Sequence, residues 1–148
     1  MTLKEFKIQY ALGALDWYDI REMANDPLTS TEVLKDLSTF DDISITHRVA
    51  KNPNTTVDAL KILSKNKYWL IRSNVAKNPN TPIDILTTLS KDKSRDIRLY
   101  LVKNPKISIY MLKNLTKDKD WYVAWNATEL LNKRKKERKK ELNDLKRV

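Results

Sequence analysis

One sequence motif recurs along this chain at a constant spacing of 26 positions. One copy opens with Val75-Ala-Lys-Asn-Pro-Asn-Thr-Pro, and Val49-Ala-Lys-Asn-Pro-Asn-Thr stands one period before it. Leu101-Val-Lys-Asn-Pro follows one period later, and Met23-Ala-Asn-Asp-Pro is a more divergent copy upstream. A fixed period in this range is typical of proteins that stack similar structural units. The chain is therefore expected to form a stack and not a fold around one closed core.

Each unit has the pattern of two short helices. A proline follows Asn or Asp in every copy, and such a pair ends a helix and starts a turn; these prolines are Pro27, Pro53, Pro79 and Pro105. Two residues later comes a threonine with an acidic residue three positions on, a pattern that predicts a capping box; these threonines are Thr29, Thr55 and Thr81. First helices are thus expected from about residues 30, 56 and 82. A second helix follows, with apolar residues four apart such as Ile71 and Val75.

The period divides the chain into a cap, four repeats and an extension. Residues 1–22 are expected to be a helical N-terminal cap or half repeat, which Gly13 divides in two. The repeats are predicted at 23–48, 49–74, 75–100 and 101–126, and residues 127–148 form a basic helical extension. No proline follows Asp120, so Trp121 to Val148 is expected to run as one long helix.

The repeat resembles a known family of helical repeats. Val-Ala-Lys-Asn-Pro-Asn-Thr-Pro, followed by Leu-x-x-Leu-Ser-x-Asp and Ile-Arg, resembles the leucine-rich repeat variant family and is similar to the wider class of HEAT-like repeats. The resemblance implies an all-α, right-handed α-solenoid of about four two-helix repeats. Some members of the family carry a cysteine-rich cluster-binding segment, but this chain has no Cys, so that property does not transfer. HEAT-like solenoids also include alkylpurine DNA glycosylases, and under that minor alternative Asp96 or Asp120 would be the catalytic acid, but the chain has only about four repeats and neither Asp differs from a helix cap or a surface pair.

Composition separates an acidic third from a basic remainder. The net charge is +10, but residues 1–48 hold 5 Lys/Arg against 9 Asp/Glu, and residues 133–148 hold 9 against 3. A basic surface of this size favours an acidic partner. The absence of Cys, of a signal peptide and of a long apolar run is consistent with a cytoplasmic protein that does not enter a membrane.

Tryptophan and arginine share positions on the second helices. Trp69, Arg95 and Trp121 stand one period apart, two positions before the apolar residue that faces the core, and Trp125 lies two positions after it. At 100° per residue both positions point away from the core, toward the side expected to be concave. Aromatic rings with Arg favour partner binding. The alternative is that these rings fill gaps between helices.

The lysines also recur with the period. Two columns lie in the turn between the helices of a unit, and they comprise Lys65, Lys91, Lys117, Lys67, Lys93 and Lys119. A third column is Lys51, Lys77 and Lys103, and the basic extension opens with Lys133, Arg134, Lys135 and Lys136. Such columns suit a phosphate backbone, although duplication of one unit also explains their regularity. Buried pairs are expected instead for Arg72 and Arg98, with Asp92 and Asp118 as their carboxylates.

These patterns predict a non-catalytic interaction module without cofactor, metal or small-molecule substrate. The macromolecular partner would contact the Trp/Arg face, the lysine columns and the basic helix, and the protein would act as an adaptor or an inhibitor. The alternative is a nucleic-acid-binding protein that contacts phosphates without strong sequence specificity. His47 is the single histidine, and no metal-ligand or nucleophile motif accompanies it. The sequence leaves protein, DNA and RNA partners open, together with the oligomeric state.

Overall fold

The computed structural model describes residues 1–146, and the regular secondary structure of this part of the chain is entirely α-helical. Its elements are α1 (Leu3–Ala11), α2 (Trp17–Asn25), α3 (Thr31–Leu37), α4 (Ile43–Lys51), α5 (Val57–Leu63), α6 (Trp69–Lys77), α7 (Ile83–Leu89), α8 (Arg95–Val102), α9 (Ile109–Leu115) and α10 (Trp121–Leu145). No strand occurs among the described residues, so the predicted all-α class is confirmed. The last two residues of the expected long C-terminal helix, 147–148, lie outside the described part.

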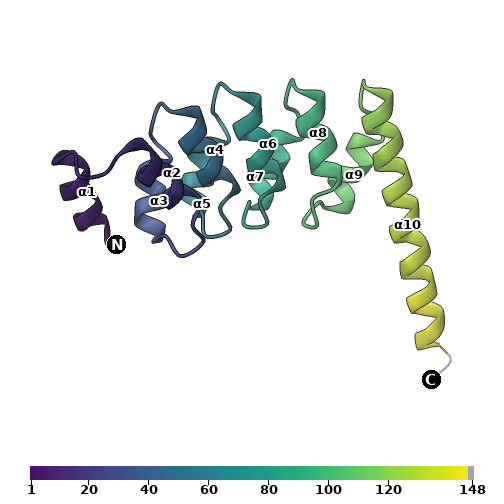
Figure 1. Cartoon of the computed structure of the whole chain (residues 1–148). Coiled ribbons are helices and arrows are strands. Elements are labelled where there is room, and N and C mark those ends of the chain that lie inside the picture. Colours follow the sequence, from purple (N-terminus) through teal and green to yellow (C-terminus); the bar gives the residue numbers. More distant parts are fainter. Residues whose placement is uncertain (147–148) are drawn as a thin grey trace.

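The helices lie in two rows along one direction (Figure 1). The longer row contains α2, α4, α6, α8 and α10, each packed against the next. Helices α3, α5, α7 and α9 lie alongside it, and the two chain ends lie at opposite ends of the molecule. Helix α10 starts level with the other helices of its row and continues well beyond them. Each helix of seven to nine residues is too short to be stable alone and depends on its neighbours.

The N-terminal segment forms two helices, with Gly13 between them. Gly13 has φ 66°, a left-handed conformation that a residue without Cβ adopts most easily, and it ends the run of α1. Helix α2 then starts at a capping box, in which the Asp16 side chain accepts from the Asp19 amide at 2.8 Å. The break at Gly13 was predicted, and α2 takes the place of a second helix at the start of the long row.

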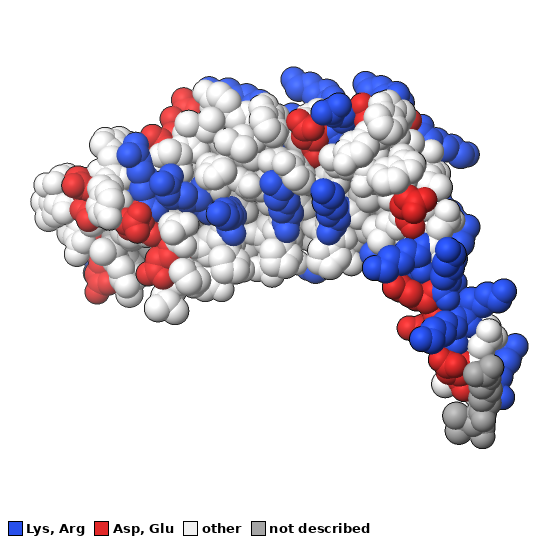
Figure 2. All heavy atoms as spheres, turned by 45° about the vertical axis from the view of Figure 1, so that its right-hand side comes forward, with Lys and Arg blue, Asp and Glu red and all other residues white. Residues whose placement is uncertain are grey.

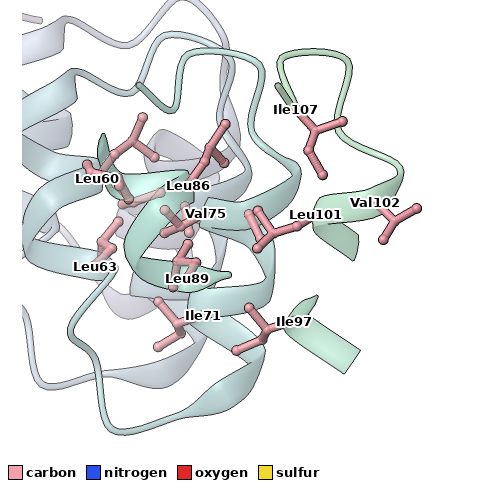
Figure 3. Packing of buried hydrophobic residues seen from close by; sticks show 14 of the residues in the cluster. Leu60, Leu63, Ile71, Val75, Leu86, Leu89, Ile97, Leu101, Val102 and Ile107 are labelled. Atoms are coloured by element: carbon pink, nitrogen blue, oxygen red, sulfur yellow. The ribbon is translucent and has the colours of Figure 1, made fainter. Parts of the chain in front are cut away.

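One continuous core runs between the two rows. Leu60, Leu63, Leu86 and Leu89 from the shorter row are turned toward Ile71, Val75, Ile97 and Leu101 of the longer row (Figure 3). All eight side chains are at most 2% exposed. The core residues recur with the period of the sequence, as the apolar pattern predicted, so each unit contributes the same layer. Burial of such a layer is the main favourable contribution to folding.

An asparagine side chain joins each unit to the one before it. Asn78 Nδ2 donates to the carbonyl oxygens of Ala50 (2.9 Å) and Asn52 (3.0 Å), and its Oδ1 accepts from the Asn80 amide. The same contacts recur one period away, where Asn52 donates to the Ala24 and Asp26 carbonyls and Asn104 to the Ala76 carbonyl. We call Asn52, Asn78 and Asn104 the asparagine ladder. All three are at most 3% exposed, so the regular spacing of the Lys-Asn-Pro motif has a structural cause.

The threonines of the motif do not cap the following helices, and this part of the prediction is wrong. Thr81 Oγ1 donates to the Val75 carbonyl at 2.6 Å, and Thr29 Oγ1 donates to the Met23 carbonyl at 2.6 Å. They therefore satisfy the C-terminal end of the preceding helix. The first helices begin one residue later than a threonine cap requires, at Thr31, Val57 and Ile83. The tight turn brings each threonine hydroxyl within hydrogen-bond distance of a carbonyl of the preceding helix, so the hydroxyl donates to that carbonyl.

Two arginines bridge successive turns, as the sequence predicted. Arg72 donates to both carboxylate oxygens of Asp92 at 2.7 and 3.0 Å, and Arg98 does the same to Asp118 at 2.6 and 2.8 Å. The first pair is 8% and 9% exposed and the second is 5% and 6% exposed, so both pairs are buried. Burial alone would raise the pKa of Asp92, but hydrogen bonds from Arg72 and the Ser94 amide outweigh it and lower the pKa. The pKa of Asp118 is lowered in the same way.

Loss of one ladder side chain should destabilise the whole fold. Asn78→Ala would remove the donor to the buried Ala50 carbonyl, one of the two donors to the Asn52 carbonyl and the acceptor of the Asn80 amide, which costs about 1–3 kcal/mol in the free energy of unfolding. Asn114→Ala is the matched control, because Asn114 is exposed on α9 and should change stability by less than about 0.5 kcal/mol. Urea denaturation followed by circular dichroism measures both, and equal effects would contradict the structural role of the ladder.

The buried ion pairs should make stability depend on acid pH. The folded-state pKa values of Asp92 and Asp118 lie below the unfolded value, so the pairs stabilise the fold above about pH 4. This stabilisation is lost as the pH falls through the lowered values. Asp92→Asn should cost about 3–5 kcal/mol at neutral pH and flatten the acid dependence. The control is Asp84→Asn at an exposed position, which should leave the unfolding free energy at pH 3 and pH 7 close to wild type.

Candidate binding surface

The second helices of successive units begin along one edge of the molecule. We call this surface the turn edge, and it comprises residues 64–70, 90–96 and 116–125, the turns before α6, α8 and α10 together with the first residues of these helices. Trp69, Arg95 and Trp121 are the first residues of the three helices. The period of the sequence thus places them at equivalent points of neighbouring helices in one row.

The predicted tryptophans are exposed and do not fill gaps in the core. Trp69 is 48% exposed, Trp121 is 75% exposed and Trp125 is 55% exposed. The Trp121 ring centroid lies 5.5 Å from that of Tyr122, which stacks on Trp125 at 6.1 Å with 14° between the planes. The start of α10 therefore presents three neighbouring aromatic rings to the solvent. Contiguous exposed rings of this kind are typical of surfaces that contact a partner.

The predicted turn lysines all lie on the turn edge. They are exposed without exception, and they comprise Lys65, Lys67, Lys91, Lys93, Lys117 and Lys119. Lys67 pairs with Asp41 at 3.6 Å and lies over the Tyr68 ring at 5.1 Å. The other five form no ion pair within residues 1–146. Figure 2 shows basic side chains along the upper edge of the stack and in a second row across the middle of this face, with acidic ones at the N-terminal end and also among the basic ones at the upper edge.

The carboxylates nearest the turn edge are already engaged. Asp92 and Asp118 are held in the buried arginine pairs. Arg95 lies 3.5 Å from Asp96 and 3.8 Å from Asp120, and Asp120 also accepts from two amides at the start of α10. These acids offset the lysines only in part, so the edge keeps a positive potential. Arg95 is exposed and occupies the equivalent position between Trp69 and Trp121 along the row of second helices.

The surface is hollowed where α6 and α8 begin. An open hollow of about 630 Å³ lies between these helices, and Lys67, Trp69 and Lys93 line it together with Tyr68 and Asp96. An aromatic face and two ammonium groups thus share one concave patch. The predicted Trp69 is part of this patch, whereas Trp121 and Trp125 lie further along the edge, on α10.

The basic C-terminal residues divide into docked and exposed ones. Arg134 is half-buried, and its guanidinium donates to the Ile107 carbonyl at 2.7 Å. It therefore holds α10 against the preceding unit, a role that the prediction of a binding residue did not include. Lys133, Lys135 and Lys136 are exposed. Lys133 lines an open hollow of about 420 Å³ between α8 and α10, so these residues lie apart from the turn edge.

The third lysine column lies at the other ends of the helices. Lys51 and Lys77 are the last residues of α4 and α6, next to the asparagine ladder, and Lys77 Nζ lies 3.5 Å from the Tyr100 ring centroid. His47 lies here too, with Nδ1 2.8 Å from Asn74 Nδ2. Burial and then the positive charges of Lys51, Arg48 and Lys77 lower the pKa of His47.

One exposed aromatic residue at an equivalent position was not among the predicted binding residues. Trp17 is the first residue of α2, two periods before Trp69, and it is 52% exposed. The repeat period alone would have identified it. Its surroundings differ, because Gly13 and Leu15 stand where the later units carry the turn lysines, and Asp19 stands where they carry an apolar residue. The aromatic row therefore continues into the acidic end of the molecule.

No helix within residues 1–146 is both long and apolar enough to span a membrane. The same part of the chain contains no group of three or more residues arranged to bind a metal ion. Comparison of the chain with protein-family models, with curated proteins and with solved structures finds no match.

The exposure of every tryptophan has a spectroscopic consequence. Because Trp17, Trp69, Trp121 and Trp125 are each about half or more exposed, their emission in the native protein should resemble that of water-exposed indole. The emission maximum should shift only slightly upon unfolding in guanidinium chloride, and acrylamide should quench the native protein efficiently. A large red shift upon unfolding would show instead that rings are buried.

Proposed function

We propose that the chain is a non-catalytic interaction module whose turn edge binds an anionic macromolecule. In this proposal the two rows of helices form a right-handed α-solenoid of four two-helix repeats, similar to leucine-rich repeat variant and HEAT-like proteins. Such stacks offer a long surface with equivalent positions at each unit, which suits binding of an extended partner. The protein would act as an adaptor or an inhibitor.

The observation that carries the proposal is the combination of exposed rings and lysines on one edge. Trp69, Trp121 and Trp125 are exposed there, and five of six turn lysines form no ion pair in the described residues. Neither feature belongs to the core, the asparagine ladder or the buried arginine pairs, which are made by other side chains. Large exposed rings cost free energy in water, and contact with a partner recovers it.

A nucleic acid is the second candidate for the partner, and the spacing of the lysines favours it. Each unit from α6 to α10 contributes two lysines at the same place, so the positive charges form a row along the edge. Neighbouring helices pack about 8–10 Å apart, a separation that spans a small number of phosphates on a strand. A regular row of cations suits a polymer with regular charges, and binding would not depend strongly on sequence.

A heparin column tests whether the turn edge binds polyanions. One variant carries three neutral substitutions on the edge: Lys65→Gln, Lys91→Gln and Lys117→Gln. Its matched control carries three substitutions at the opposite ends of the helices: Lys51→Gln, Lys77→Gln and Lys103→Gln. Both lose three positive charges, so a general charge effect would lower the eluting salt concentration equally. The edge variant is expected to elute at clearly lower salt than the control, and equal elution would reject the edge as the binding surface.

The contribution of the basic C-terminal helix can be separated in the same assay. Lys135, Lys136, Lys139 and Lys140 are exposed and are replaced by Gln in the full-length chain. Arg134 is kept, because its contact with Ile107 holds α10 in place. If these four substitutions abolish retention while the edge variant elutes like wild type, the helix and not the edge binds polyanions.

A further inference from the structure

We propose that the turn edge binds single-stranded nucleic acid, with bases stacked on Trp69 and on the ring group of α10 and phosphates held by the turn lysines. This inference rests on the proposed function and makes it more specific. It concerns the part of the edge from α6 to α10, where rings and lysines occur together. It requires an unpaired strand, because only unpaired bases expose their faces to a protein ring.

The rings are placed to receive bases. Trp69 lies at the wall of the hollow between α6 and α8, with Lys67 and Lys93 beside it. Trp121 is 75% exposed, and the stacked pair of Tyr122 and Trp125 continues the aromatic surface along α10. An indole that lies open on one face can stack on any base, which gives affinity without sequence preference.

The distance between the two ring sites suits a short length of strand. Trp69 and Trp121 are equivalent residues two units apart, which corresponds to roughly 16–20 Å at the usual helix separation. Arg95 occupies the equivalent position between them, and Lys91, Lys93, Lys117 and Lys119 lie in the intervening turns. A strand that follows the edge would therefore meet a ring, a guanidinium and a second ring in turn, with ammonium groups beside its phosphates.

The residue types favour a nucleic acid over a protein at this edge. Protein interfaces are enriched in aromatic residues and Arg but depleted in Lys, because the flexible ammonium group loses hydration and entropy upon burial. Here six lysines accompany the rings. Contacts with phosphate leave lysine partly solvated, so that cost is small. A duplex would use the lysines but leave the aromatic rings without a base to stack on.

The charge distribution also sets one end of the site. Toward the N-terminus the turn before α4 contains Asp41 and Asp42, and the start of α2 contains Asp16 and Asp19. Asp16 and Asp42 cap α2 and α4, so their carboxylates lie at the starts of these helices. Phosphates would be repelled there, although Trp17 is exposed. Trp17 therefore lies outside the proposed site and provides an internal control of the same residue type and helix position.

The test compares two strands that carry the same charge. A fluorescent oligothymidylate of about 15 nucleotides and an abasic strand of equal length are titrated with the full-length protein, and anisotropy gives the two dissociation constants. The abasic strand keeps every phosphate but has no bases. Wild type is expected to bind the thymidylate at least about tenfold more tightly. Equal affinity for the two strands would overturn the proposal.

Substitutions assign the preference to the rings. The triple variant Trp69→Ala, Trp121→Ala and Trp125→Ala should bind the thymidylate no more tightly than the abasic strand. Its affinity for the abasic strand should equal that of wild type. Phenylalanine at the same three positions keeps an aromatic face and should retain much of the preference. Trp17→Ala should behave like wild type, and a preference that survives in the triple alanine variant would overturn the proposal. Circular dichroism checks that each variant is folded.

The remaining outcomes separate this inference from the proposed function. A duplex or a poly-glutamate peptide that competes better than the thymidylate, at equal charge concentration, would overturn the single-strand proposal in favour of that partner. Retention on heparin through the edge lysines, without a preference for bases, leaves the interaction module intact and overturns only the inference. If retention on heparin does not depend on the edge lysines and the protein shows no preference for bases, the turn edge is rejected as a binding surface.

Discussion

The fold depends on a side-chain amide that each unit extends to the unit before it. Asn52, Asn78 and Asn104 donate to carbonyls of the preceding unit, and each also accepts from an amide in its own turn. Short helices of seven to nine residues are unstable in isolation, so the spacing between them must be fixed by contacts between units. The ladder fixes that spacing at one edge, and the buried pairs of Arg72 and Arg98 fix it at the other.

Because the ladder and the arginine pairs hold the units together, the exposed residues of the turn edge remain available for contact with a partner. The arginine pairs take up the buried carboxylates, and the core takes up the apolar stripes of both rows. The turn lysines and the rings of Trp69 and Trp121 have no comparable structural partner in the described part of the chain. Equivalent residues of successive units therefore form a continuous surface, although no single unit is large enough to bind an extended molecule. A binding role follows from the arrangement of units and not from any one residue.

Periodicity made the helices, the core residues and the arginine pairs predictable, because each is repeated and each has only one plausible partner type. The hydroxyls of Thr29, Thr55 and Thr81 were assigned to the wrong helix, since a cap and a C-terminal contact have the same sequence pattern and differ only in turn geometry. The contact of Arg134 with the Ile107 carbonyl was not predicted, because Arg134 stands in a run of basic residues that otherwise face the solvent. The period identified Trp69, Arg95 and Trp121 as one column, but their exposure required the packed structure. The identity of the partner depends on a second molecule, and a single sequence carries no record of it.

The ladder has a direction, and that direction bears on how the chain is made. Every asparagine of the ladder donates toward the N-terminus, so its amide needs only the unit before it, whereas Arg72 and Arg98 find their carboxylates in the unit that follows. The series ends where Leu130 replaces the next asparagine and α10 continues without a turn. A ribosome releases the N-terminal units first. Each emerging unit thus finds the acceptors of its ladder asparagine already in position, and the stack can grow in the order of translation, one unit at a time.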